Sequence, residues 1–276
     1  MKLIKGNIKS AAIGRKFLEA LRSRKKLKGG EMRVDPVAET TPEEPYQPTP
    51  EESLSFAAAD MIGHFQSPGV VGEFSFLGEG SPHQSQYIQD ELFGDVNYTQ
   101  VWDKDLGEYR PVDATRDAWS GATVSKLATA FDPTFEGSAR HSDYIRRGFQ
   151  GEDYLHGGGN YEAEKATKKT EYQPGDILFM GRTDKDGNPL GPQNWKQFKK
   201  DAEGKGDWGK ESGYGSHSDV ITGTRTAQEK DVESGLARKV GEIIYEVQGG
   251  NMGDTLYVKE FSAKGLANRY AGRLTQ

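Results

Sequence analysis

The chain has 276 residues, enough for one large domain or two small ones with a buried core. Its apolar fraction of 34% is low for a globular protein, which predicts that part of the chain forms loops, tails or partner-dependent segments. It contains no cysteine, so disulfides, thiolate zinc sites and a cysteine nucleophile are excluded.

Residues 1–30 are strongly basic, with ten Lys or Arg against the single Glu19, while the remaining chain carries a net charge of about −15. Apolar residues at helical spacing predict a basic amphipathic helix here, formed around Ile4, Ile8, Ala11, Leu18 and Leu21. The segment lacks the continuous apolar stretch of a signal peptide or transmembrane helix. We expect it to tether the chain to another protein; a solvated tail, membrane binding and nucleic-acid binding are the alternatives. Nucleic acid is the weakest of these because the rest of the chain is acidic and shows no nucleic-acid-binding signature.

Residues 31–52 combine five prolines with many acids, the composition of an extended linker. Residues 53–276 are predicted to form the folded domain, of which residues 53–110 are the N-terminal part and residues 111–276 the core. Helices are expected at 53–65 and 85–93 within the N-terminal part. No independent function is predicted for this part.

From residue 117 onward the pattern becomes more regular. Residues 117–131 predict a helix whose first turn holds Trp119 and Ser120, and three strands follow at 175–182, 217–224 and 242–251. A helix followed by several strands indicates an α+β fold.

Five segments of this region resemble, in order and spacing, the CHAP and NlpC-like peptidoglycan hydrolases. AWSGATVSKL resembles their nucleophile-bearing helix, with Ser120 at the cysteine position, and YQPGDILFMGR resembles the Pro-Gly-Asp turn that opens the next strand. GSHSDVITG and IYEVQGGNMGDTLYVKEF resemble the strand that carries the base and the terminal GGN turn. FEGSARHSDYIRRG resembles the small-residue stretch that follows the helix. The similarity is greatest to an uncharacterised bacterial and phage branch that also has serine in place of cysteine.

The resemblance implies a papain-like fold with an antiparallel sheet and assigns roles to particular residues. Ser120 would be the nucleophile, His217 the general base and Asn251 the residue that orients it. Counterparts of further residues of that branch are expected to line the cleft and bind substrate, namely Trp119, His141 and Arg182. The resemblance does not cover residues 1 to about 60, and residues 183–214 resemble an insertion.

The chemistry of these residue types is compatible with those roles. A nucleophile in the first turn of a helix gains from the helix dipole and from free backbone N–H groups. A serine hydroxyl, however, needs stronger activation than a cysteine thiol, and a histidine oriented by a neutral Asn provides little. In serine proteases, replacing the orienting Asp by Asn lowers turnover about 10⁴-fold. Asp219 lies two residues beyond His217, hence on the same strand face, and is predicted to supply the missing negative charge.

Each residue also has a purely structural interpretation. Ser120 would then be a helix N-cap and His217 a satisfied core histidine. Asn251 would serve only its turn, and His141 would bond a backbone carbonyl. Arg182 would form a surface ion pair, while Asp219 would cap a hydrogen-bond network or bind substrate amines.

The sequence predicts no metal site and no cofactor, since the histidines are dispersed and the DKDGNPLG segment lacks the full spacing of a calcium loop. The preferred function is a peptidoglycan amidase or endopeptidase carried in a phage virion, possessing no signal peptide or transmembrane segment and acting at the host cell envelope. Peptidoglycan peptide is its expected substrate, and another virion protein would bind residues 1–30. The alternative is a catalytically inactive structural or adaptor protein of the virion that keeps the hydrolase fold.

Overall fold

The structure is a computed structural model that describes residues 46–65, 86–103, 106–114, 117–150, 161–206, 208, 213–250 and 256–276. The chain divides into two compact units, residues 1–48 and residues 49–276. The second unit holds every helix and strand described below. The predicted basic helix of residues 1–30, most of the predicted linker and Asn251 lie outside the described residues.

The first helix of the folded unit, α2, spans Pro50–Phe65 and begins inside the range that was predicted to be linker. A capping box explains its start. The Thr49 backbone N–H donates to Glu52 Oε2 at 2.9 Å, and the Glu52 N–H donates to Thr49 Oγ1 at 3.2 Å. Pro50 fits at the first helical position, where its missing N–H is not needed. The acidic residues that resembled linker composition are therefore the first turn of a helix.

Residues 86–114 form a small, partly independent layer. A π-helical turn, Ile88–Leu92, continues into α4 at Phe93–Asp95. Strands β1, Gln100–Asp103, and β2, Glu108–Pro111, then pair as an antiparallel hairpin. The buried side chains of Ile88, Leu92 and Phe93 join the main core, which fixes this layer to the rest of the domain.

The main sheet has six strands in the order β3-β8-β4-β5-β6-β7, and every pairing is antiparallel. The central strands confirm the three that the sequence predicted: β4 at Ile177–Gly181, β5 at Ser216–Thr226 and β6 at Ile243–Gly249. The segment IYEVQGGNMGDTLYVKEF, which resembles a strand-turn-strand ending, also contains β7 at Tyr257–Ser262. The sequence did not predict the other two strands, which are β3 at Glu162–Lys165 and β8 at Gly272–Thr275. The α+β class is therefore confirmed.

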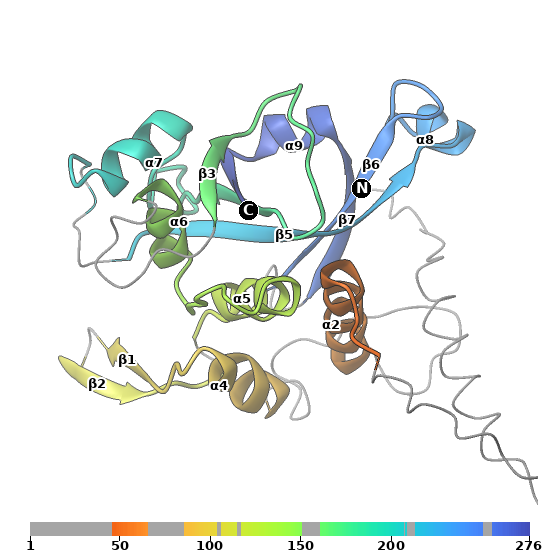
Figure 1. Ribbon diagram of the computed structural model, residues 1–276. Helices are drawn as coiled ribbons and strands as arrows, with labels where there is room; N and C mark the ends of the chain where they lie inside the picture. The colour runs from red at the N-terminus through yellow and green to blue at the C-terminus, as the bar shows by residue number, and fades with distance from the viewer. Residues whose placement is uncertain are drawn as a thin grey trace, which may run out of the picture. The chain divides into compact units, whose positions relative to one another are not determined.

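Helices cover both faces of this sheet (Figure 1). On one face lie α2 and α5, Ser120–Phe131, packed on the inward side chains Ile177, Phe179 and Val220. On the other lies α9, Ala263–Arg269, packed on the alternate side chains Leu178 and Ile221. Two further helices are α6 at His141–Gln150 and α8 at Glu229–Glu233. The alternation along β4 and β5 follows from the two-residue period of a strand.

The region expected to be an insertion, residues 183–214, contributes a helix to the domain core. This helix, α7, spans Trp195–Ala202 and buries Phe198. The Trp195 ring stacks on Phe179 of β4 with their centroids 6.3 Å apart. On its other side, Asp201 Oδ2 accepts a hydrogen bond from Arg146 Nε of α6 at 2.8 Å. The segment is therefore an integral part of the fold rather than a surface decoration.

No helix in the described ranges is both long and apolar enough to cross a membrane.

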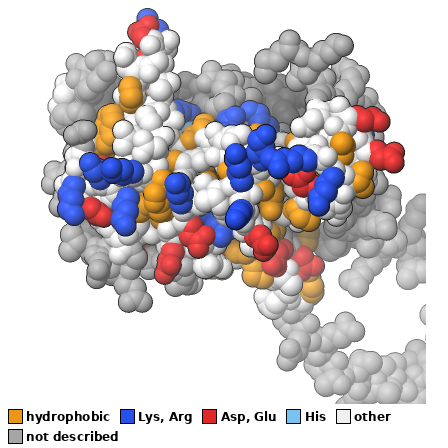
Figure 2. Space-filling view, turned by 90° about the horizontal axis from the view of Figure 1, so that it is seen from above, with side chains coloured by type: hydrophobic (Ala, Val, Ile, Leu, Met, Phe, Trp, Pro, Cys, Tyr) orange, Lys and Arg blue, Asp and Glu red, His pale blue; other side chains and the backbone are white. Residues whose placement is uncertain are grey.

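Seen from the α9 side, lysine and arginine side chains form a band across the domain (Figure 2), although the chain as a whole has a net charge of −6. Basic charge is therefore not confined to residues 1–30.

Candidate active site

Ser120 is the first residue of α5, and its hydroxyl is directed at a histidine. The N-cap residue of this helix is Trp119, which makes no side-chain cap hydrogen bond. Ser120 is therefore not the N-cap. Its Oγ lies 2.7 Å from His141 Nε2 instead. The backbone N–H groups of the first turn have no intrahelical partners, so the hydroxyl sits where a helix stabilises negative charge.

Two glycines allow the segment before α6 to approach α5 closely enough for this contact. A Cβ on Gly121 would lie 2.5 Å from the carbonyl carbon of Ala139, and a Cβ on Gly137 would lie 2.7 Å from Ser125 Cβ. Ser125 then fastens the segment, because its Oγ donates to the Ser138 carbonyl and accepts from the Ser138 N–H, both at 2.9 Å. These two hydrogen bonds fix the segment that leads to His141, the first residue of α6.

His141 is held from its other side by Tyr144, one helical turn further along α6. His141 Nδ1 and the Tyr144 hydroxyl are hydrogen-bonded, and both side chains are buried. Burial lowers the pKa of His141 well below its usual value, and the nearby His217 and Arg182 lower it further. Burial also raises the pKa of the Tyr144 hydroxyl well above its ordinary value. The trio is therefore a serine, a neutral imidazole and a protonated phenol.

A second buried chain of hydrogen bonds lies beside the first. His217 Nε2 is 2.9 Å from Asp219 Oδ1, and Tyr270, which follows α9, donates its hydroxyl proton to Asp219 Oδ2. The rings of His217 and His141 are 5.8 Å apart between centroids. Arg182, just beyond β4, places Nη2 3.5 Å from His217 Nδ1. The two chains thus meet where the two histidine rings face each other.

These distances assign the histidines differently from the sequence prediction. The hydroxyl of Ser120 contacts His141, for which only a cleft-lining role was predicted. His217, predicted to be the base, has Nε2 on Asp219 and Nδ1 facing Arg182. A general base must reach the proton that it removes, and His141 is the histidine placed to do so.

Trp119, predicted to contact substrate, is fully buried, and a side chain with no exposed surface cannot touch a substrate in this conformation. Asn251 lies outside the described residues. The residue before it, Gly250, packs on the first turn of α5: a Cβ there would lie 2.5 Å from both Thr123 Oγ1 and the Trp119 ring.

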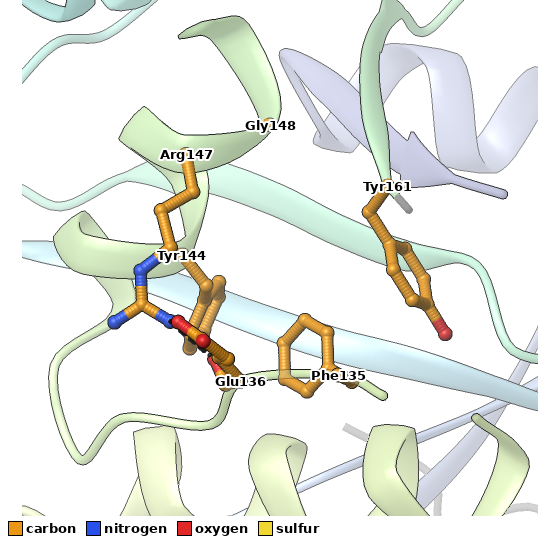
Figure 3. Close-up of a pocket in the computed structure, with 6 residues that line it drawn as sticks. All are labelled: Phe135, Glu136, Tyr144, Arg147, Gly148 and Tyr161. Carbon is orange, nitrogen blue, oxygen red and sulfur yellow. Dashed lines mark hydrogen bonds and ion pairs between the residues drawn. The ribbon is translucent and has the colours of Figure 1, made fainter. Parts of the chain in front are cut away.

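The ring of Tyr144 also lines a small hollow between α6, the α5–α6 connection and β3 (Figure 3). Phe135 packs between Tyr144 and Tyr161, with centroid separations of 5.8 and 5.1 Å. At the rim, Arg147 Nη1 contacts the Glu136 carboxylate at 3.3 Å. The aromatic contacts fix the Tyr144 ring, and with it the hydroxyl that holds His141.

The described residues contain no cluster of His, Asp or Glu that could hold a metal ion. In the DKDGNPLG segment, the Asp184 carboxylate accepts hydrogen bonds from Asp186 N and Asn188 N at 2.9 and 2.8 Å, the geometry of a tight turn.

Sequence reasoning missed two members of the site. The sequence analysis assigned no role to Tyr144, although its position three residues after His141 places both on one face of a helix. Tyr270 gave no signal, because its contact with Asp219 spans 51 residues and depends on the packing of α9.

Comparison of the chain with protein-family models, with curated proteins and with solved structures finds no match. The resemblance to peptidoglycan hydrolases therefore remains a prediction from the sequence.

Proposed function

We propose that residues 111–276 form a papain-like hydrolase domain that cleaves an amide bond in the peptide of peptidoglycan, with Ser120 as nucleophile and His141 as general base. The observation that carries the proposal is the 2.7 Å contact between Ser120 Oγ and His141 Nε2 at the N-terminus of a buried helix. A helix whose first turn bears the nucleophile, packed on an antiparallel sheet, is also the arrangement that the sequence resemblance implies.

The proposed reaction is acyl transfer through the serine. Ser120 Oγ attacks the amide carbonyl carbon while His141 Nε2 takes the hydroxyl proton. First-turn N–H groups of α5 stabilise the negative charge on the carbonyl oxygen. The C–N bond then breaks, and His141 returns the proton to the leaving amine. Water repeats the sequence on the acyl-enzyme and releases the acid, again with His141 as base.

Tyr144 supplies the orientation that a carboxylate supplies in serine proteases. In the base-competent tautomer, His141 Nδ1–H donates to the Tyr144 oxygen and leaves Nε2 free to accept from Ser120. A neutral phenol stabilises imidazolium less than a carboxylate does, so we expect turnover to be slow by the standard of a Ser-His-Asp enzyme. Asp219 affects the Ser120–His141 pair only indirectly, because its hydrogen bond is to His217.

The place of action belongs to the same proposal. We place the protein in a phage virion, tethered to another virion protein through residues 1–30 and acting at the host cell envelope. The support is the charge of that segment, ten basic residues against one acid, together with the resemblance to cell-wall hydrolases.

One observation favours the alternative of an inactive structural or adaptor protein. Ser120 is 2% exposed and His141 is 8% exposed, so in this conformation little of the pair reaches solvent. Hydrolysis requires a substrate to gain access to Ser120, whereas an adaptor needs only the fold.

The test is incubation of the full chain with purified peptidoglycan, followed by mass analysis of the released fragments. We expect new amine and carboxyl termini with the wild type and none with Ser120→Ala. Ser120→Cys should retain or raise activity, because a thiolate needs less assistance than a hydroxyl. Background release by wild type, Ser120→Ala and Ser120→Cys alike would leave the adaptor function as the better account.

A further inference from the structure

Arg182 is a cation beside the reacting pair that has no acidic partner among the described residues. Two other arginines that pack against the domain are paired with acids: Arg146 with Asp201 at 2.8 Å, and Arg225 with Asp231 and Glu260 at 2.6 and 2.5 Å. Arg182 instead places its guanidinium 3.5 Å from the nitrogen of a histidine. A half-buried guanidinium is rarely left without an anion, because its charge is costly to desolvate.

The fold holds this residue firmly in place. The Arg182 N–H donates to the Gly215 carbonyl at 3.0 Å, and the Arg182 carbonyl accepts from Leu190 N and Gln193 Nε2, each at 2.9 Å. These bonds fix the backbone where β4 passes into the segment that leads to α7. A cation on such a fixed backbone is preorganised to bind an anion.

The buried chain Tyr270–Asp219–His217 orients the guanidinium. In the tautomer whose Nε2–H donates to Asp219, the lone pair on Nδ1 of His217 faces Arg182 Nη2. Tyr270 holds the second oxygen of Asp219. The chain therefore gives His217 a role that does not involve the proton of Ser120.

We infer that Arg182 binds a carboxylate of the substrate close to the scissile bond, and that Tyr270, Asp219 and His217 are the residues that position it. This inference rests on the proposed function and names its substrate class: peptides with a free carboxylate near the bond that is cut. Arg182 and Ser120 are separated by the two histidine rings, a span of the order of two extended residues. A planar guanidinium fork matches a planar carboxylate bidentately.

Carboxylate binding at Arg182 also affects the base. The positive charge of Arg182 is one of the causes that hold the pKa of His141 low. A bound carboxylate neutralises that charge, so His141 accepts the Ser120 proton more readily when the correct substrate is present. Substrate binding and proton transfer to His141 are therefore coupled through Arg182.

The first experiment measures binding without turnover. Ser120→Ala protein is titrated calorimetrically with N-acetyl-alanyl-alanine in its L and D forms, with the matching carboxamides, and with inorganic phosphate. We expect one of the two acids to bind at least tenfold more tightly than its carboxamide and than phosphate. In the double variant Ser120→Ala, Arg182→Gln, the difference in affinity between acid and amide should disappear. The control combines Ser120→Ala with Arg238→Gln; Arg238 is an exposed arginine on the α8–β6 connection, and the difference in affinity should persist. Equal binding of acid and amide, or equal binding of phosphate, overturns the inference.

The second experiment measures turnover and separates this inference from the proposed function. The peptide substrates differ only in having a free carboxylate or a carboxamide. In the wild type, kcat/KM should be about 10–100-fold lower for the amide than for the acid. Arg182→Gln should lower kcat/KM by the same factor for the acid substrate only. Tyr270→Phe should reduce the acid-to-amide ratio, a readout that a merely structural role leaves unchanged. Acid binding without any cleavage would retain the anion site and reject the hydrolase; cleavage with a ratio of one would retain the hydrolase and reject the anion site. The acid-to-amide comparison in unmutated protein keeps the test decisive if Arg182→Gln does not fold.

Discussion

Substitution of Gly121 by alanine tests whether the close approach of α5 to the segment before α6 creates the reacting pair. A Cβ at this position would lie 2.5 Å from the Ala139 carbonyl carbon, whereas ordinary contact begins at 3.4 Å, so the two segments must separate by about 1 Å. That movement would open the 2.7 Å contact of Ser120 with His141 beyond hydrogen-bond distance. A misplacement of about 1 Å costs on the order of 100-fold in rate.

The effect on stability should be modest, and the protein should remain folded. Alanine gains about 1 kcal/mol of helix propensity over glycine, while overpacking costs about 1–3 kcal/mol, which leaves a net loss of about 0–2 kcal/mol. Urea unfolding and peptidoglycan digestion of the same preparations measure the two quantities. The matched control is Gly63→Ala in α2, where a Cβ meets nothing within 4 Å; it should leave activity unchanged and stabilise the fold by about 1 kcal/mol. Full activity in Gly121→Ala would refute the role given to this close approach.

Further predictions concern the neighbours of this pair and the fold that carries it. Tyr144→Phe should lower kcat about 10–100-fold by removing the hydrogen bond to His141 Nδ1, while Tyr161→Phe, which removes a hydroxyl with no described partner from the same hollow, should not. Because the pKa of His141 is lowered, its neutral form persists below pH 6.5, so kcat/KM should remain high under mildly acidic conditions; an NMR titration of His141 with a midpoint at or above 6.5 would contradict this. The same shift means that the unfolded chain binds a proton that the folded chain does not, so stability should decrease as pH falls below about 6.5. Asp201→Ala should destabilise the fold by about 3–5 kcal/mol, since it removes the buried carboxylate that accepts from the Arg146 guanidinium, whereas Glu203→Ala, in an exposed pair with Lys205, should leave the urea midpoint unchanged.

The sequence predicted elements that are rich in apolar residues and missed helices and strands that contain few of them. Helix α5 and strands β4, β5 and β6 are of the first kind, and the two-residue period of a strand correctly placed Asp219 beside His217. Helix α6 contains few apolar residues and buries His141 and Arg146, so its sequence does not stand out as a buried helix. Helix α7 lies in residues 183–214, the range that resembles an insertion, and its buried residues Phe198 and Asp201 are few within a lysine-rich segment, so the sequence did not predict it as a helix.

The contact between Ser120 and His141 was beyond sequence reasoning for a different reason. It joins residues 21 positions apart and depends on how closely two backbones approach at Gly121 and Gly137. Glycines signal that such an approach is permitted, but they do not say which segment makes it. Family resemblance therefore assigned the base to His217, whereas packing brings His141 to the hydroxyl.

Covalent labelling of Ser120 tests most directly whether it is a nucleophile activated by His141. A fluorophosphonate probe reacts with an activated serine: the oxygen bonds to phosphorus, fluoride leaves, and the base takes the proton. The full chain and its variants are incubated with the probe, and the modified residue is located by peptide mass analysis, with circular dichroism confirming that each variant is folded. We expect labelling of Ser120 in the wild type, a loss of at least about 1000-fold in rate for His141→Ala, and a smaller loss for His217→Ala. Labelling of Ser120 that persists in His141→Ala but disappears in His217→Ala would contradict the account.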